Sequence, residues 1–211
     1  MQAPLPSSSQ TATSQTMIPI GYLPKIIVKK PDCLNAENVI DIYSVGDCIS
    51  GSFADYIDYW VHNGYWIFNS LEDIQNLVKQ EGLSFAGTRM FYYEAYQYEF
   101  DQDNQKWLAF FPTQSIPTDV QMPTHKSLAG YDIVTFNRRT NPACSPHSCD
   151  YVALPEHSPL SCNYVAAESG IVVNKHCLFH TFEEAKEALE MGVFEKAEPG
   201  LYRIFAVYTV D

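Results

Sequence analysis

The most constraining feature of this sequence is that its second part repeats the pattern of its first. A stretch that opens with Gly-Tyr and closes with two basic residues occurs twice, 109 positions apart, and three further matches follow in the same order. The matched segments are 21–30 with 130–139, 31–33 with 142–144, 62–73 with 173–184, and 89–91 with 203–205. Matches that keep their order indicate an internal duplication, so we expect two halves built on one plan.

Each half contains a segment with the pattern of an amphipathic helix. Ser70 and Thr181 are each followed three residues later by an acidic residue, which is the spacing of a capping box. Apolar residues then recur with the period of an α-helix, and Gly82 and Gly192 stand where such helices end. The pattern predicts one such helix in each half, and a similar capping signal at Ser52 predicts another in the first half.

Segments rich in aromatic and β-branched residues follow these helices. They span 88–101 and 201–211, and their composition is typical of β-strands. Residues 106–111 have the same character and follow the turn-forming residues Asp103 and Asn104, which predicts a hairpin.

These elements predict an α+β fold in which two similar β-α-β halves share one core, with a mostly antiparallel sheet and the helices on one face. Residues 1–16 carry no charge and no periodic pattern, so we expect a disordered N-terminal extension. Several prolines interrupt 112–129, which predicts a Pro-rich linker. The two halves are therefore expected at 17–111 and 130–211.

The charge balance excludes several classes of partner. Thirteen Lys and Arg against twenty-five Asp and Glu give a formal net charge of −12, which disfavours nucleic acid and anionic membranes as ligands. No apolar run approaches the roughly 20 residues of a membrane span, and no secretory signal is visible. We expect a cytoplasmic protein that binds neither nucleic acid nor membrane.

The acidic composition comes with fourteen tyrosines, many of them beside carboxylates, as in 53–60 and 92–101. Tyrosine supplies contact area in protein interfaces, and negative charge steers a basic partner. The leading hypothesis is a small acidic binding or regulatory protein without catalysis, such as an inhibitor or immunity protein that blocks a basic enzyme. The candidate partner-binding residues are Asp55, Asp58, Tyr59, Tyr96, Glu99 and Asp101.

An enzyme with a site between the two halves is the first alternative. Glu94 is a candidate acid or base, because tyrosines on its strand face would partly desolvate it. The repeated stretches 21–30 and 130–139 are expected to be the opening strands of the two halves. Arg138 lies at the end of the second and would suit an anionic ligand. The adjacent pair His176 and Cys177 suggests a nucleophile, although neighbours on a strand point to opposite faces. The sequence contains no phosphate loop, dinucleotide fingerprint, nucleophile elbow or His-Glu-x-x-His motif.

A zinc-stabilised module is the second alternative, and zinc is the only cofactor the sequence suggests. Three cysteines and one histidine follow the spacing Cys-x4-Cys-x7-His-x4-Cys, and such a set could complete a tetrahedral site. The candidate ligands are Cys144, Cys149, His157 and Cys162. Reduced thiols remain an alternative, as do disulfides that pair Cys33 with Cys48 and Cys144 with one of its neighbours.

Overall fold

The computed structural model describes residues 16–30, 32, 34–44, 68–84, 86–109, 119–135, 163–195 and 201–210. Its elements in chain order are β1 (Met17–Lys29), β2 (Asp41–Ser44), α2 (Leu71–Glu81), β3 (Thr88–Tyr96), β4 (Tyr98–Asp101), β5 (Lys106–Ala109), β6 (Lys126–Thr135), α4 (Asn163–Glu168), α5 (Phe182–Glu190) and β7 (Leu201–Val210). The fold is of the expected mixed kind, an antiparallel sheet with few helices.

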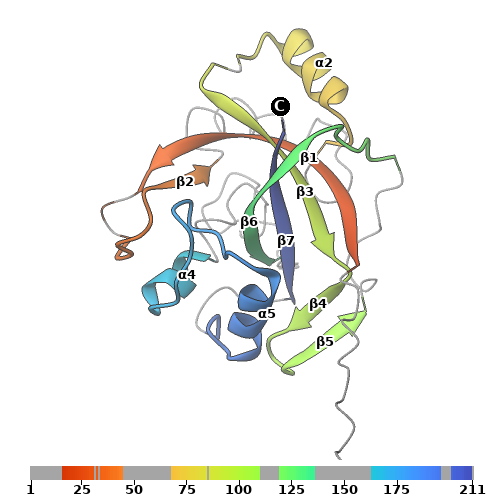
Figure 1. Ribbon diagram of the computed structural model, residues 1–211. Helices are drawn as coiled ribbons and strands as arrows, with labels where there is room; N and C mark the ends of the chain where they lie inside the picture. Colours follow the sequence, from red (N-terminus) through yellow and green to blue (C-terminus); the bar gives the residue numbers. More distant parts are fainter. Residues whose placement is uncertain are drawn as a thin grey trace, which may run out of the picture.

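The strands form one sheet in the order β2-β1-β3-β7-β4-β5, and β6 pairs with β7 as well. Every pairing within the described residues is antiparallel. Strand β6 occupies one edge of β7, so β3 and β4 lie one after the other along the opposite edge. The sheet is strongly twisted, with α2 and α5 near opposite ends (Figure 1). No helix in the described ranges is long and apolar enough to cross a membrane.

The helices expected after Ser70 and Thr181 are confirmed. The Ser70 hydroxyl accepts a hydrogen bond from the Asp73 amide at 3.1 Å, and Gly82 closes α2 in a left-handed conformation with φ of +66°. Thr181 and Glu184 form a complete capping box at the start of α5. The further helix predicted after Ser52 lies outside the described residues.

The strands differ from expectation at their ends. The predicted strand 88–101 is interrupted at Gln97, which divides it into β3 and β4. The predicted hairpin is present, and the Asp101 carboxylate stabilises its turn by accepting hydrogen bonds from Asn104. Strands β1 and β6 begin before Gly21 and Gly130. Each glycine therefore lies inside its strand, next to a shift of pairing register.

Two backbone bridges of the same kind connect β1 and β6 to the segments that precede α2 and α5. Tyr22 exchanges two hydrogen bonds with Phe68, of 2.8 and 3.0 Å, and Tyr131 exchanges two with Phe179, both of 2.9 Å. The corresponding strands match in register too: Lys25 faces Arg89, and Val134 faces Arg203. Between these two pairings, Tyr93 of β3 faces Val207 of β7. The register of β1 with β3 therefore matches the register of β6 with β7.

The apolar side of each helix packs on the sheet. Helix α5 buries Phe182, Ala185 and Leu189 in a cluster with Ile133 and Ile204. Helix α2 buries Ile74 in a second cluster built around β1, β3 and β7. Directly paired strand residues point to the same side of a sheet, so Ile133 and Ile204 define the face that α5 covers.

Candidate site between the two helices

A row of tyrosines occupies the sheet face that carries α5. Tyr22 faces Tyr92, which faces Tyr208, and Glu94 lies two residues after Tyr92 on the same side of β3. Ala206 pairs with both Glu94 and Tyr131, which brings Tyr131 to this face as well. We call this region, between α5 and the start of α2, the interhelical surface. Its exposed or half-buried members are Tyr96, Lys126, Tyr131 and Tyr208, and the buried side chains of Tyr22, Tyr92 and Glu94 lie directly beneath them.

Glu94 lies at the centre of the interhelical surface and is 7% exposed. The Tyr208 hydroxyl donates a hydrogen bond to Oε2 at 2.9 Å, and the Lys126 ammonium binds Oε1. The same ammonium lies 4.0 Å from the centre of the Tyr208 ring and 5.1 Å from that of Tyr92. Each carboxylate oxygen therefore has a partner, and the charge of Glu94 is balanced within the chain.

The environment keeps the tyrosines around Glu94 protonated. Burial raises the pKa of the Tyr92 and Tyr208 hydroxyls, and the Glu94 carboxylate raises both further by its charge and by hydrogen bonding. At neutral pH both hydroxyls are hydrogen-bond donors. Tyr208 donates to Glu94, and Tyr92 lies 2.9 Å from the Met122 sulfur.

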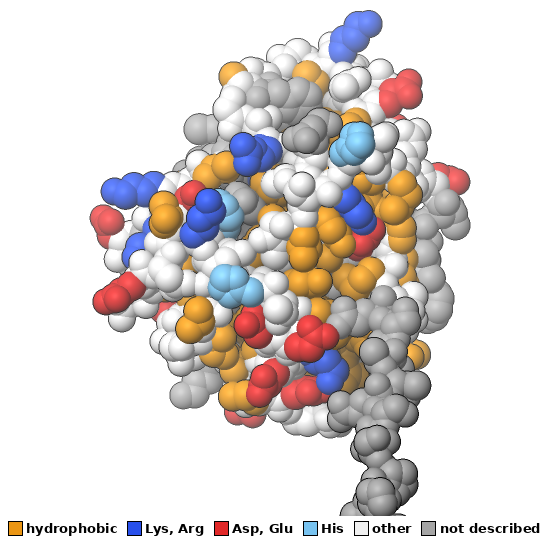
Figure 2. All heavy atoms as spheres, in the orientation of Figure 1, with side chains coloured by type: hydrophobic (Ala, Val, Ile, Leu, Met, Phe, Trp, Pro, Cys, Tyr) orange, Lys and Arg blue, Asp and Glu red, His pale blue; other side chains and the backbone are white. Residues whose placement is uncertain are grey.

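An aromatic group with an acidic border lies at the α5 end of the interhelical surface. The Tyr96 ring is 4.6 Å from that of Phe182 and 5.6 Å from that of Trp107. The Trp107 indole donates to Glu190 at 2.8 Å, and Glu190 also accepts from Lys186 at 2.6 Å. Figure 2 shows hydrophobic side chains gathered over the middle of this view, with acidic side chains below them over α5 and the hairpin.

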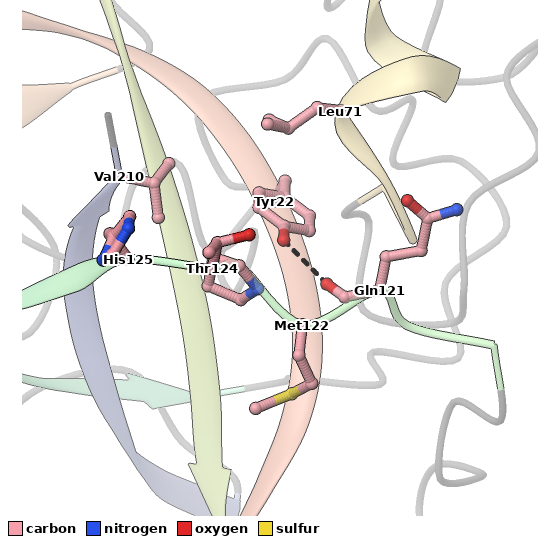
Figure 3. Close-up of a pocket in the computed structure, with 8 residues that line it drawn as sticks. Tyr22, Leu71, Gln121, Met122, Thr124, His125 and Val210 are labelled. Carbon is pink, nitrogen blue, oxygen red and sulfur yellow. Dashed lines mark hydrogen bonds between the residues drawn. The ribbon is translucent and has the colours of Figure 1, made fainter.

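A pocket of about 210 Å³ adjoins the surface at the α2 end. Tyr22, Leu71 and Val210 line it together with residues 121–125. The Tyr22 hydroxyl donates to the Gln121 carbonyl at 2.7 Å and so holds this segment against β1 (Figure 3). Typical small-molecule pockets enclose about 300–1,000 Å³, so this pocket has room for a single side chain rather than for a cofactor.

The structure separates the histidine and the cysteine that the sequence places side by side. His176 Nδ1 contacts the Asp41 carboxylate of β2. Cys177 is fully buried, and burial raises the pKa of its thiol to about 12, with a further contribution from the charge of Asp132. A protonated, buried thiol is a poor nucleophile. Arg138 lies outside the described residues.

Cys177 is accordingly expected to resist alkylation in the folded protein. Iodoacetamide at pH 8 should modify it about a hundredfold more slowly than in denatured protein, as read from the mass of its proteolytic peptide. The folded pKa of about 12 exceeds the ordinary 9.0, so the stability this thiol contributes is complete below pH 9 and is lost as the pH rises toward 12. Equal alkylation rates in the two states would contradict this assignment.

The expected partner-binding residues fall in different places. Tyr96 belongs to the interhelical surface, whereas Asp101 stabilises the hairpin turn. Glu99 is only 1% exposed and accepts hydrogen bonds from Arg203, so it is not part of an exposed binding surface. Asp55, Asp58 and Tyr59 lie outside the described residues.

All four candidate zinc ligands, Cys144, Cys149, His157 and Cys162, lie outside the described residues. Among the residues that are described, no group of three or more His, Cys, Asp or Glu side chains is placed to hold a metal ion. Cys177 is a free thiol.

Four residues of this region, Tyr22, Lys126, Tyr131 and Tyr208, were not predicted from the sequence as site residues, and two of them bind Glu94. Lys126 falls in the segment expected to be a linker, but it is the first residue of β6. Tyr208 belongs to a predicted strand, but only the pairing of β3 with β7 places it beside Glu94. The alternation of Tyr92, Glu94 and Tyr96 along β3 was the available signal for this face.

Comparison of the chain with protein-family models, with curated proteins and with solved structures gives no match.

Proposed function

We propose that this chain is a non-catalytic binding protein that takes a basic protein partner on the interhelical surface. The observation that carries the proposal is the pairing of Glu94 with Lys126 and Tyr208. This pairing occupies the central carboxylate of the surface, while the tyrosines around it stay protonated. Such a surface offers preformed aromatic contacts rather than a free acid or base.

The charge around the aromatic residues favours a basic partner. Helix α5 exposes Glu183, Glu184, Glu187 and Glu190 against the single cation Lys186, and the whole chain carries a net charge of −12. Arginine and lysine side chains of a partner would find both carboxylates and tyrosine faces here. An inhibitor or regulator of a basic protein is the class of function that this combination supports.

We also infer that the two halves descend from one duplicated β-α-β unit. The matching bridges of Tyr22 with Phe68 and of Tyr131 with Phe179 support this inference, as do the matching strand registers. The interhelical surface lies where the two units join. A binding surface at such a junction can acquire different residues from each copy, here Glu94 from the first and Tyr208 from the second.

The double variant Glu183→Lys/Glu187→Lys tests the proposed surface. These residues lie one turn apart on α5. Burial raises the pKa of the Tyr131 hydroxyl, and the nearby charge of Glu183 raises it further. The partner is first captured with the intact protein and identified. The variant should then bind that partner about tenfold or more weakly, as measured by calorimetry. The melting temperature should show that the variant is folded.

Glu37→Lys/Glu168→Lys is the matched control. It changes the net charge by the same amount, but both residues are exposed beside the third core cluster, which includes Leu34 and Ala167. This control should change the affinity less than about twofold. Equal weakening by both double variants would mean that only net charge matters. Unchanged binding by the α5 variant would reject the surface.

A further inference from the structure

The Lys126 side chain is held as a ligand would be held. Its ammonium contacts a carboxylate that is more than nine-tenths buried, and it lies over two tyrosine rings at 4.0 and 5.1 Å. A buried carboxylate flanked by aromatic faces is the arrangement that binds organic ammonium ions in aromatic cages. We define the ammonium cage by the residues Tyr92, Glu94 and Tyr208.

We propose that the ammonium cage is a recognition site for a primary alkylammonium group, the terminus of a lysine side chain, and that Lys126 occupies it when no partner is bound. The assignment of that lysine to a protein partner rests on the proposed function. The cage itself is defined by the geometry of the chain and can be tested without a partner.

The cage is organised independently of its occupant. Tyr208 donates to Glu94 Oε2, which leaves Oε1 directed at the ammonium. Tyr92 and Glu94 are fixed by the pairing of β3 with β7, in the middle of the sheet. Removing the Lys126 ammonium therefore leaves two aromatic faces and a carboxylate oxygen in place, with the charge of Glu94 unbalanced.

Lys126 can leave the cage without disturbing the sheet. It is held by its backbone as the first residue of β6, opposite Val210, and its side chain is 27% exposed. Four methylene carbons joined by rotatable bonds separate the backbone from the ammonium, so the side chain can move into solvent. Exchange with an incoming lysine replaces one ammonium by another and keeps the carboxylate paired.

The pocket in Figure 3 adjoins the cage. Gln121, Thr124 and His125 give part of it a polar lining, and its other side offers apolar contacts to the stem of an incoming side chain. Val210 lines the pocket and is the strand partner of Lys126, while the Tyr22 ring lies 5.1 Å from that of Tyr92. With Leu71, these residues give an apolar wall next to the cage. A lysine has the matching structure, because a hydrocarbon stem carries its charged end.

The test is binding of n-butylammonium to the full chain carrying Lys126→Ala. We expect saturable binding with a Kd on the order of 10 mM, followed by NMR shifts and by a rise in melting temperature. The parent protein should bind at least about tenfold more weakly, because its own lysine competes. Butanol, which has nearly the same shape without the charge, should produce neither effect.

Two further variants make the result specific. Adding Glu94→Gln to Lys126→Ala should abolish the response. Lys186→Ala should create no site, although Lys186 also binds a carboxylate and lies 5.8 Å from the Trp107 ring, because that pair is exposed on α5. Lys126→Gln provides a second cage-opening variant if the alanine variant does not fold.

A cage-opening variant that folds but does not bind butylammonium would overturn the proposal. Butylammonium binding that persists after Glu94→Gln would overturn it as well. The proposed partner surface is judged separately by the α5 charge reversals. If butylammonium binds but the charge reversals leave partner binding unchanged, the cage is retained and the basic protein partner is rejected.

Discussion

Replacing Arg203 with methionine is expected to lower the free energy of unfolding by about 3–5 kcal/mol. Arg203 and Glu99 are 0% and 1% exposed, and the guanidinium donates to Glu99 Oε2 from Nε at 3.1 Å and from Nη2 at 2.7 Å. Loss of the guanidinium removes two hydrogen bonds and the positive charge of Arg203 from a buried carboxylate. Urea unfolding at pH 7, followed by circular dichroism, measures the effect.

The double variant Glu99→Leu/Arg203→Met separates the charge from the packing. Replacing both members of a buried pair by apolar residues is often neutral or stabilising, so most of the lost stability should return. Lys186→Ala, which breaks an exposed pair with Glu190, should cost less than about 1 kcal/mol. An Arg203→Met variant as stable as the parent would show that the buried pair contributes little.

The location of this pair explains why it matters for the candidate site. It joins β4 to β7, two strands whose pairing comprises only Phe100 with Tyr202 and Asp101 with Leu201. The pair therefore adds a side-chain link to a short ladder. The hairpin that β4 begins also carries Trp107, which packs beside Tyr96 at the α5 end of the interhelical surface. Loosening the pair should weaken partner binding as well as stability.

The helices could be predicted because their signals are local. An N-cap hydroxyl, an acidic residue three positions later and a glycine stop all act within one or two turns. Helix α2 ends on Gly82, and in α5 the C-cap Met191 is followed by Gly192 with φ of +71°. The mostly antiparallel sheet was also predictable from its strand composition. The exact strand ends were not, because the interruption at Gln97 depends on β3 and β4 both pairing with β7.

The site was only partly predictable, for a different reason. Period-two alternation along β3 places Glu94 on a face with tyrosines, and the structure has Glu94 beside Tyr92 as expected. Its bonded partners Lys126 and Tyr208 lie 32 and 114 positions away in the sequence. Which residue of β7 faces Glu94 depends on strand register, and alternation fixes only the face, not the register.

The burial of Glu99 was likewise not predictable from its neighbours in the sequence. In the sequence it stands among tyrosines and aspartates, as an exposed residue would. Its burial is linked to Arg203, which is the only charged residue of β7. A buried arginine requires an anionic partner, so Arg203 was the available signal for a buried carboxylate.

Gly130→Ala is expected to lower the free energy of unfolding by about 3 kcal/mol or more. A Cβ at this position would lie 2.6 Å from the Leu178 Cβ, 2.8 Å from the Phe179 carbonyl oxygen and 2.9 Å from the side-chain nitrogen Nδ2 of Asn174. The backbone φ of +150° adds strain for any residue with a side chain. The neighbouring Tyr131 bridge to Phe179 would have to shift, so the α5 end of the interhelical surface should move too.

Gly87→Ala is the control that separates the cost of steric overlap at Gly130 from the cost of a positive φ. Gly87 also has a positive φ, of +79°, but a Cβ there would meet nothing within 4 Å. Its cost should be about 1 kcal/mol, from backbone strain alone. The difference between the two variants then measures the contact between β6 and residues 174–179. Equal losses would mean that the segment moves aside freely, in which case Tyr131 is not held rigidly and the interhelical surface is not preformed at that end.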